Sequence, residues 1–251
     1  MSKEIKAVKL SDIPDYLKLK ENEDTGLSNM ESDDLQVPRL KICQPTSSEI
    51  KDTIDIKDGD FYNTLTNKNY GNTVEFFALL FWRSKVWFSE DFKLLCVSYK
   101  DATTGKQIIF GNEQETCLQE NNYQYKKDGL HDNGYKDSHN YMIVMKEDLA
   151  DMNNLPLPTI FSTMSSAMKY SKQLNGHLKL NGMKQIPIYA GLIKSETFGQ
   201  TFTKGKAFMP KFSYPDFATK QEFEILKVMH YEATKIHSRG EVIMGAEEAP
   251  Y

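Results

Sequence analysis

The stretch Asn72–Glu90, NTVEFFALLFWRSKVWFSE, is rich in Phe and contains both Trp residues of the chain. Its aromatic and β-branched content predicts a strand, in which successive side chains point to opposite faces. We expect one face to pack in the core, through Phe76, Ala78, Leu80 and Trp82. The opposite face is then expected to point toward a groove and to present two rings and two cations: Phe81, Arg83, Lys85 and Trp87.

The composition of the chain limits what its surface as a whole can bind. The 251 residues carry a formal net charge of −4, and 39 % of them are hydrophobic, which is enough for one large domain or two small ones. An acidic protein has no general attraction for nucleic acid. Any anion site is therefore expected to be local.

Three sequence features bear on the location of the protein, and the first two of them indicate a reducing compartment. Cys43, Cys96 and Cys117 are an odd number without CxxC spacing, the N-terminus shows no signal peptide, and no run of about 18 apolar residues occurs. We expect a cytoplasmic protein, in the host cell cytoplasm if a phage encodes it, that does not contact a membrane.

Charge and apolar content divide the chain into three parts. Residues 1–34 hold nine acidic and five basic side chains with few large apolar ones, so we expect an acidic flexible arm. Residues 35–240 carry the apolar segments and form the predicted binding domain. Residues 241–251 include GAEEAPY and are predicted to be an acidic mobile tail.

Five further segments have the β-branched and aromatic content of strands or the turn residues of hairpins. We expect a hairpin over Gly59–Asn72 and strands over Phe92–Tyr99, Lys106–Gly111 and Tyr141–Asp148. A second hairpin is expected to join Gln185–Phe198 and Thr201–Phe212 around Gly199 and Gln200. The polar segment 112–140 is predicted to be a long loop.

Helical spacing of apolar residues occurs in two places. One helix is predicted from Pro158 to Gly176 and a second from Ala218 to Ile236. The sum is an α+β fold, a mostly antiparallel β-barrel of the oligonucleotide-binding type with two helices.

The sequence offers no catalytic constellation. It lacks both the phosphate-binding motif GxxxxGK[ST] and the dinucleotide motif GxGxxG, so we expect a protein that is not an enzyme and uses no cofactor. The potential zinc ligands have spacings that fit no compact knuckle, so no metal site is predicted among Cys96, Cys117, His131 and His139.

Charge is distributed unevenly along the chain. Residues 155–215 carry eight Lys against one acid, a net charge of +7, whereas the rest of the chain sums to −11. A local electropositive surface in an acidic protein suits phosphate, although a solvated lysine-rich face would also account for the charge.

Aromatic residues interleave with these cations. In the segment 201–212, TFTKGKAFMPKF, the even positions of a strand would share one face: Phe202, Lys204, Lys206, Phe208 and Phe212. Single strands bind by stacking bases on rings while cations track the phosphates. The predicted nucleic-acid-binding residues are Phe81, Arg83, Lys85, Trp87, Lys169, Lys172, Tyr189, Lys194, Lys204, Lys206, Phe208 and Lys211.

The C-terminus EEAPY resembles the acidic, aromatic-ended tips of bacterial and phage single-stranded-DNA-binding proteins. That resemblance implies a tail that recruits replication or recombination proteins and competes with DNA for the basic surface. The residues concerned are Glu247, Glu248, Pro250 and Tyr251.

A broader resemblance covers residues 35–212 and rests on several segments in order: SDDLQVPRLKICQ, GDFYNTLTNKNYG, VEFFALLFWRSKVWF, PTIFSTMSSAMKYSKQL, IPIYAGL and GKAFMPKF. These resemble a group of tailed-phage proteins regarded as single-stranded-DNA-binding or replication accessory proteins. The resemblance implies a protein that coats exposed strands during replication or recombination without sequence preference.

Two other functions fit the same residues. A strand-annealing recombination protein would form multimeric rings on DNA, and a phage structural or host-interaction protein would use its aromatic face to bind protein. The sequence leaves the oligomeric state open, and a homo-oligomer is one of the states that it allows. It also leaves open whether the protein prefers DNA or RNA.

Overall fold

The computed structural model describes seven stretches of the chain: residues 37–88, 94–100, 107–110, 136–149, 156–180, 186–203 and 205–239. For some of these residues, including Trp87 and Phe88, only the backbone is described. The predicted arm, 1–34, and tail, 241–251, lie outside the described residues, so both stay predictions.

One sheet of ten strands contains all the β structure of the described residues. The strands are β1 (Arg39–Ile42), β2 (Phe61–Asn63), β3 (Asn69–Gly71), β4 (Thr73–Phe88), β5 (Leu94–Lys100), β6 (Gln107–Phe110), β7 (Lys136–Met145), β8 (Thr159–Met164), β9 (Gly191–Phe202) and β10 (Gly205–Phe217). Their order is β10-β9-β4-β7-β8-β1-β2-β3, with β5 added to the far half of β4 and β6 to β5. All pairs are antiparallel except β1 with β8.

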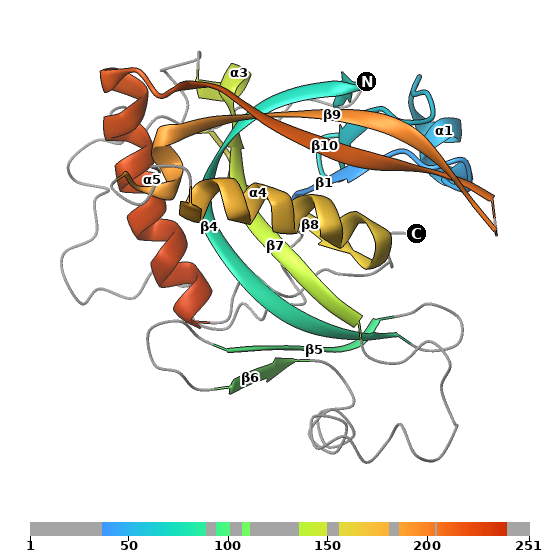
Figure 1. Cartoon of the computed structure of the whole chain (residues 1–251), viewed down its shortest axis with the longest axis horizontal. Helices are drawn as coiled ribbons and strands as arrows, with labels where there is room; N and C mark the ends of the chain where they lie inside the picture. The colour runs from blue at the N-terminus through green and yellow to red at the C-terminus, as the bar shows by residue number, and fades with distance from the viewer. Residues whose placement is uncertain are drawn as a thin grey trace, which may run out of the picture.

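Helices cover two sides of this sheet. The described residues contain α1 (Ser48–Thr53), α3 (Lys146–Leu149), α4 (Met168–Leu180) and α5 (Lys220–Arg239), with 3₁₀ turns η5 (Ser165–Ala167) and η7 (Ile188–Ala190). The predicted α+β class with mostly antiparallel strands is confirmed. The sheet is mixed and curls into a half-barrel with more than the two predicted helices, so the oligonucleotide-binding type is not established (Figure 1).

Two groups of buried side chains lie on opposite faces of the central strands. The concave-side cluster contains Leu40, Phe61, Val74, Phe76, Ala78, Tyr141, Ile143, Met145, Phe161, Leu174 and Ile193. The α5-side cluster includes Phe77, Leu79, Trp82, Met142, Val144, Ile160, Leu226 and Met229. Rings from β2 and β10, near the two ends of the strand order, both contact Phe161, which requires the sheet to curl around the first cluster.

A β-bulge in β4 changes which face each side chain occupies. Ala78 pairs with Ile143 and Leu80 with Met142, so Leu79 has no partner on β7. The expected single core face through Phe76, Ala78, Leu80 and Trp82 is therefore wrong. The first two of these lie in the concave-side cluster, whereas Leu80 and Trp82 pack with the α5-side cluster.

The predicted helix over Pro158–Gly176 is also wrong in its first half. Thr159–Met164 forms β8, Ser165 adopts a left-handed φ of 50°, and α4 then runs through Gly176 to Leu180. Residues four apart share a face in a strand as well as in a helix, so the spacing of Ile160 and Met164 fits both. Phe161 distinguishes the two structures, because its ring packs on the opposite face from Ile160 and Met164, as a strand requires.

The other predicted elements are present with shifted ends. The first hairpin corresponds to β2 and β3, and the predicted strands correspond to β5, β6 and β7. β7 begins at Lys136, so the end of the polar segment 112–140 is strand and its residues 112–135 lie outside the described residues. The second hairpin turns after Phe202 rather than at Gly199, and α5 begins two residues later than predicted. None of the described helices has the length and apolar character needed to cross a membrane.

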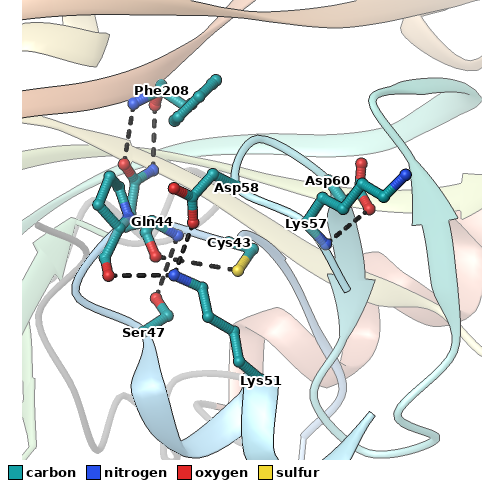
Figure 2. Close-up of polar contacts among 9 residues, drawn as sticks. Cys43, Gln44, Ser47, Lys51, Lys57, Asp58, Asp60 and Phe208 are labelled. Atoms are coloured by element: carbon teal, nitrogen blue, oxygen red, sulfur yellow. Dashed lines mark hydrogen bonds and ion pairs between the residues drawn. The ribbon is translucent and has the colours of Figure 1, made fainter. Parts of the chain in front are cut away.

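A side-chain clasp joins the two ends of the curled sheet (Figure 2). Gln44, just after β1, donates from Nε2 to the carbonyl oxygen of Phe208 at 3.0 Å and accepts at Oε1 from the Phe208 amide at 2.8 Å. Thr197 donates a further bond to the carbonyl of Gly59 at 2.6 Å. Gly59 has a φ of +93°, and an added Cβ would lie 2.6 Å from the Phe208 ring. The Gln44 amide thus replaces a strand neighbour for β10.

Replacing Gln44 with Ala should destabilise the fold. The variant leaves one amide and one carbonyl of β10 without their partner, which we expect to cost about 1–3 kcal/mol in the free energy of unfolding. Urea denaturation measures this, with Gln173→Ala on the exposed side of α4 as the control. Equal stability of the two variants would show that the clasp does not hold the sheet closed.

Candidate nucleic-acid interface

Helix α4 lies across the concave side of the sheet, where it contacts β7, β8 and β10 (Figure 1). Among the α4 side chains that the structure describes, Ser171 and Leu174 are buried, and Leu174 belongs to the concave-side cluster. Because a helix turns by 100° per residue, this register directs Lys169 and Lys172 toward solvent, and both are exposed.

A buried histidine fixes α4 to β7. His139 Nδ1 lies 2.7 Å from Ser171 Oγ, and both side chains are buried. The Ser171 hydroxyl donates its proton to the carbonyl of Met168 at 3.0 Å, so its oxygen is left to accept. We therefore assign the proton of neutral His139 to Nδ1, which leaves Nε2 as its basic nitrogen.

Two cations flank this histidine. Arg83 is the direct partner of His139 in the β4–β7 ladder, and Lys172 follows Ser171 on α4. Burial first, then the charges of Arg83 and Lys172, lower the pKa of His139 below its ordinary 6.5, while Asp137 opposes them. Arg83 and Lys172 are exposed, and neither forms an ion pair within the described part of the chain.

Phe81 forms the rim of this surface. Its ring centroid is 5.3 Å from that of His139 in an edge contact and 5.1 Å from that of Tyr141. The ring is half-buried against the concave-side cluster. It is thus held in a fixed position with part of its surface toward solvent.

The two remaining predicted residues of β4 are less defined. Lys85 is partly exposed and lies opposite Asp137 in the ladder, so its charge has an acidic neighbour. The backbone of Trp87 pairs with Cys96, but its side chain lies outside what the structure describes. Its role as a stacking ring stays a prediction.

Tyr170 extends the basic surface along α4 and was missed in the sequence. The ammonium of Lys169 lies 4.7 Å from the centroid of its ring, which also makes an edge contact with Phe198 at 5.3 Å. Its hydroxyl donates to Gln200 Oε1 at 3.4 Å. The adjacent pair Lys169–Tyr170 was the only sequence signal for this ring.

On the β9–β10 hairpin, the predicted alternation of cation and ring is observed in part. Lys206 is exposed and its Nζ lies 4.8 Å from the centroid of the Phe208 ring. That ring also packs on Gly59, so it supports the fold as well as facing outward. Lys204 lies outside the described residues.

Two other lysines of the hairpin have an acidic neighbour. Lys194 Nζ lies 2.7 Å from Glu196 Oε1, and Lys211 is the ladder partner of the same acid. Lys194 and, more weakly, Lys211 lower the pKa of Glu196. The predicted phosphate contact of Lys194 must therefore compete with an existing ion pair.

Tyr189 is a correction on grounds of burial. Its side chain is 7 % exposed, and its ring lies 5.4 Å from Phe223 and 5.0 Å from His230, centroid to centroid. Tyr189 belongs to η7, and its ring packs against α5 in the α5-side cluster. A base cannot stack on a ring that is covered in this way.

The remaining predictions cannot be placed. Glu247, Glu248, Pro250 and Tyr251 lie outside the described residues, as do Cys117 and His131. Within the described ranges, no three His, Cys, Asp or Glu side chains gather in a way that could hold a metal ion.

The sequence matches the family described as Pam3 phage gp34-like protein over residues 5–237. The chain belongs to this family of phage proteins. No curated protein and no solved structure matches it. The family match thus supports the expected bacteriophage origin, and it leaves the biochemical role to be argued from the surface around α4.

The lowered pKa of His139 makes stability depend on pH. The unfolded chain binds a proton at this residue more readily than the folded chain, so the stabilisation present above pH 6.5 should decrease as the pH falls below it. His139→Asn keeps an N–H donor for Ser171 but does not titrate. Its melting temperature should therefore fall less than that of the wild type when the pH is lowered from 7.5 to 5. These two pH values lie about one unit or more above and below the ordinary pKa of histidine.

The exposed His177 on the same helix provides the control. His177→Asn should keep the wild-type dependence of melting temperature on pH. The same loss of stability in wild type and His139→Asn would show that the buried histidine does not contribute to acid sensitivity.

Proposed function

We propose that this protein binds single-stranded nucleic acid, without sequence preference and without catalysis, through the surface formed by α4, β4 and β7. The observation that carries the proposal is the placement of Arg83 and Lys172. They come from separate elements, flank the same buried histidine and make no ion pair with a described acid. Exposed cations held in this way suit phosphate groups.

Aromatic rings beside these cations favour a nucleic acid over a simple anion. Phe81 lies at the rim, Tyr170 lies under Lys169, and the pair Lys206 and Phe208 repeats the arrangement on the hairpin. Rings that carry a stacked base and cations that contact the backbone are the two components of single-strand binding. Curled antiparallel sheets present such surfaces in other folds, which is support by analogy alone.

A phage origin fits a role in replication or recombination of phage DNA. In this proposal the protein coats exposed strands in the host cell, and partner proteins of those processes bind elsewhere on the chain.

A second candidate, protein binding, is favoured by the outer face of α5. Val228 and Tyr231, three residues apart on α5, are each 60 % exposed, and Phe217 at the end of β10 is 61 % exposed. Exposed apolar groups on one helix are a feature of docking surfaces. This candidate predicts no binding to oligonucleotides at low salt, so one titration separates the two.

Replacing both Arg83 and Lys172 with Ala should weaken binding to oligo-dT and flatten its salt dependence. Each lost phosphate contact on a single strand reduces the slope of log affinity against log salt by about 0.7, which corresponds to about fivefold in affinity at 0.1 M salt. Fluorescence anisotropy with labelled oligo-dT at several salt concentrations measures both quantities.

The charge-matched control is the double change Lys220→Ala and Lys227→Ala, which removes two exposed cations from α5 on the other side of the sheet. It should keep the wild-type slope. Equal slopes for the two double variants would exclude the α4 surface, and no binding by the wild type at low salt would exclude the proposed function.

A further inference from the structure

His139 lies beneath the surface that the proposed function assigns to phosphate, and that function gives it no role in binding. It is buried, and three elements around it place charged groups nearby. β4 contributes Arg83, α4 contributes Lys172 next to Ser171, and β7 itself contributes Asp137. Its ladder partner on β8, Thr163, is uncharged.

We infer that a phosphodiester bound between Arg83 and Lys172 causes His139 to take up a proton, so that nucleic-acid binding is coupled to pH. This inference rests on the proposed function and specifies how that same site is regulated. His139 acts here as a positioning residue beneath the site and need not touch the ligand.

The coupling follows from electrostatics. In the free protein two cations and burial oppose a charge on His139. A phosphate that sits against those cations offsets their charge and adds to the effect of Asp137, so the charged form of His139 is opposed less than in the free protein. Because binding favours the protonated form, protonation must favour binding to the same degree.

The hydrogen bonds allow this proton to be added without releasing the helix. Nδ1 already donates to Ser171, whose own proton is given to Met168. The added proton therefore goes to Nε2, and the contact between β7 and α4 is kept in both states. Lys172 and Arg83 both stay near His139 when it is charged, so the site remains assembled.

The structure also predicts which substitution separates packing from titration. The side-chain amide of Asn can place an N–H near the position of Nδ1, so His139→Asn should keep α4 in place. It has no group that titrates between pH 5 and 8. The variant should thus bind at pH 8 like the wild type and lose only the response to acid.

The experiment measures the dissociation constant for labelled oligo-dT between pH 5.5 and 8, at constant ionic strength, for full-length wild type, His139→Asn and His177→Asn. Wild-type affinity should rise as the pH falls, with about tenfold per pH unit as the limit for uptake of one proton. His139→Asn should show a clearly flatter profile. His177→Asn tests whether an exposed histidine of α4 is responsible instead, and should behave like the wild type.

The inference is overturned if His139→Asn shows the same dependence of affinity on pH as the wild type. It is also overturned if only His177→Asn shows a flatter dependence. In either case the protein still binds, so the proposed function stands. Wild type that binds no oligo-dT at any pH overturns the proposed function and the inference together.

A second measurement does not depend on the variant. The imidazole proton signal of His139 is followed by NMR across the same pH range in wild type, with and without unlabelled oligo-dT. The pKa of His139 should rise when the oligonucleotide binds. An unchanged pKa in a protein that binds would overturn the inference even if His139→Asn failed to fold.

Discussion

Strand β4 must satisfy the backbone hydrogen bonds of 16 residues, and the rest of the structure is arranged around that requirement. Thr73–Phe77 pairs with β9, and Phe76–Val86 pairs with β7 on the other edge. Ser84–Phe88 pairs with β5, which lies on the same edge as β9 but nearer the end of the strand. The bulge at Leu79 interrupts the alternation once within this ladder. Side chains before it divide between two cores, and after it Phe81 and Arg83 face the concave side, where α4 can reach them.

The sequence predicted those parts of the fold that depend on interactions between residues close together in the chain. The spacing of Phe223, Leu226, Met229 and Ala233 correctly predicted α5, because one helix face and one core decide it. The first hairpin was equally local. The bulge could not be predicted. Leu79 and Leu80 lie in one continuous apolar run, so the pattern of apolar residues does not show which of the two is the extra residue.

The candidate site was accessible only in part for the same reason. Arg83 and Lys172 were identified as cations, but their meeting point depends on His139 and Ser171, which are 32 residues apart and on two elements. The sequence places His139 in a polar loop and Ser171 on a helix that starts at Pro158, whereas the residues that follow Pro158 form β8. Tyr189 was assigned to the site because it lies near Lys194 in sequence, whereas tertiary packing carries its ring to α5.

The Gln44 clasp has a consequence for the order of folding. It joins residues 164 positions apart, whereas the β9–β10 hairpin and the β2–β3 hairpin close over a few residues. Loop closure over such a separation is entropically unfavourable until the intervening strands are paired. We therefore expect the clasp to form after the sheet has assembled and to break early when the protein unfolds. The half-barrel would then exist for a time as an open, correctly paired sheet whose last strand still has a free edge.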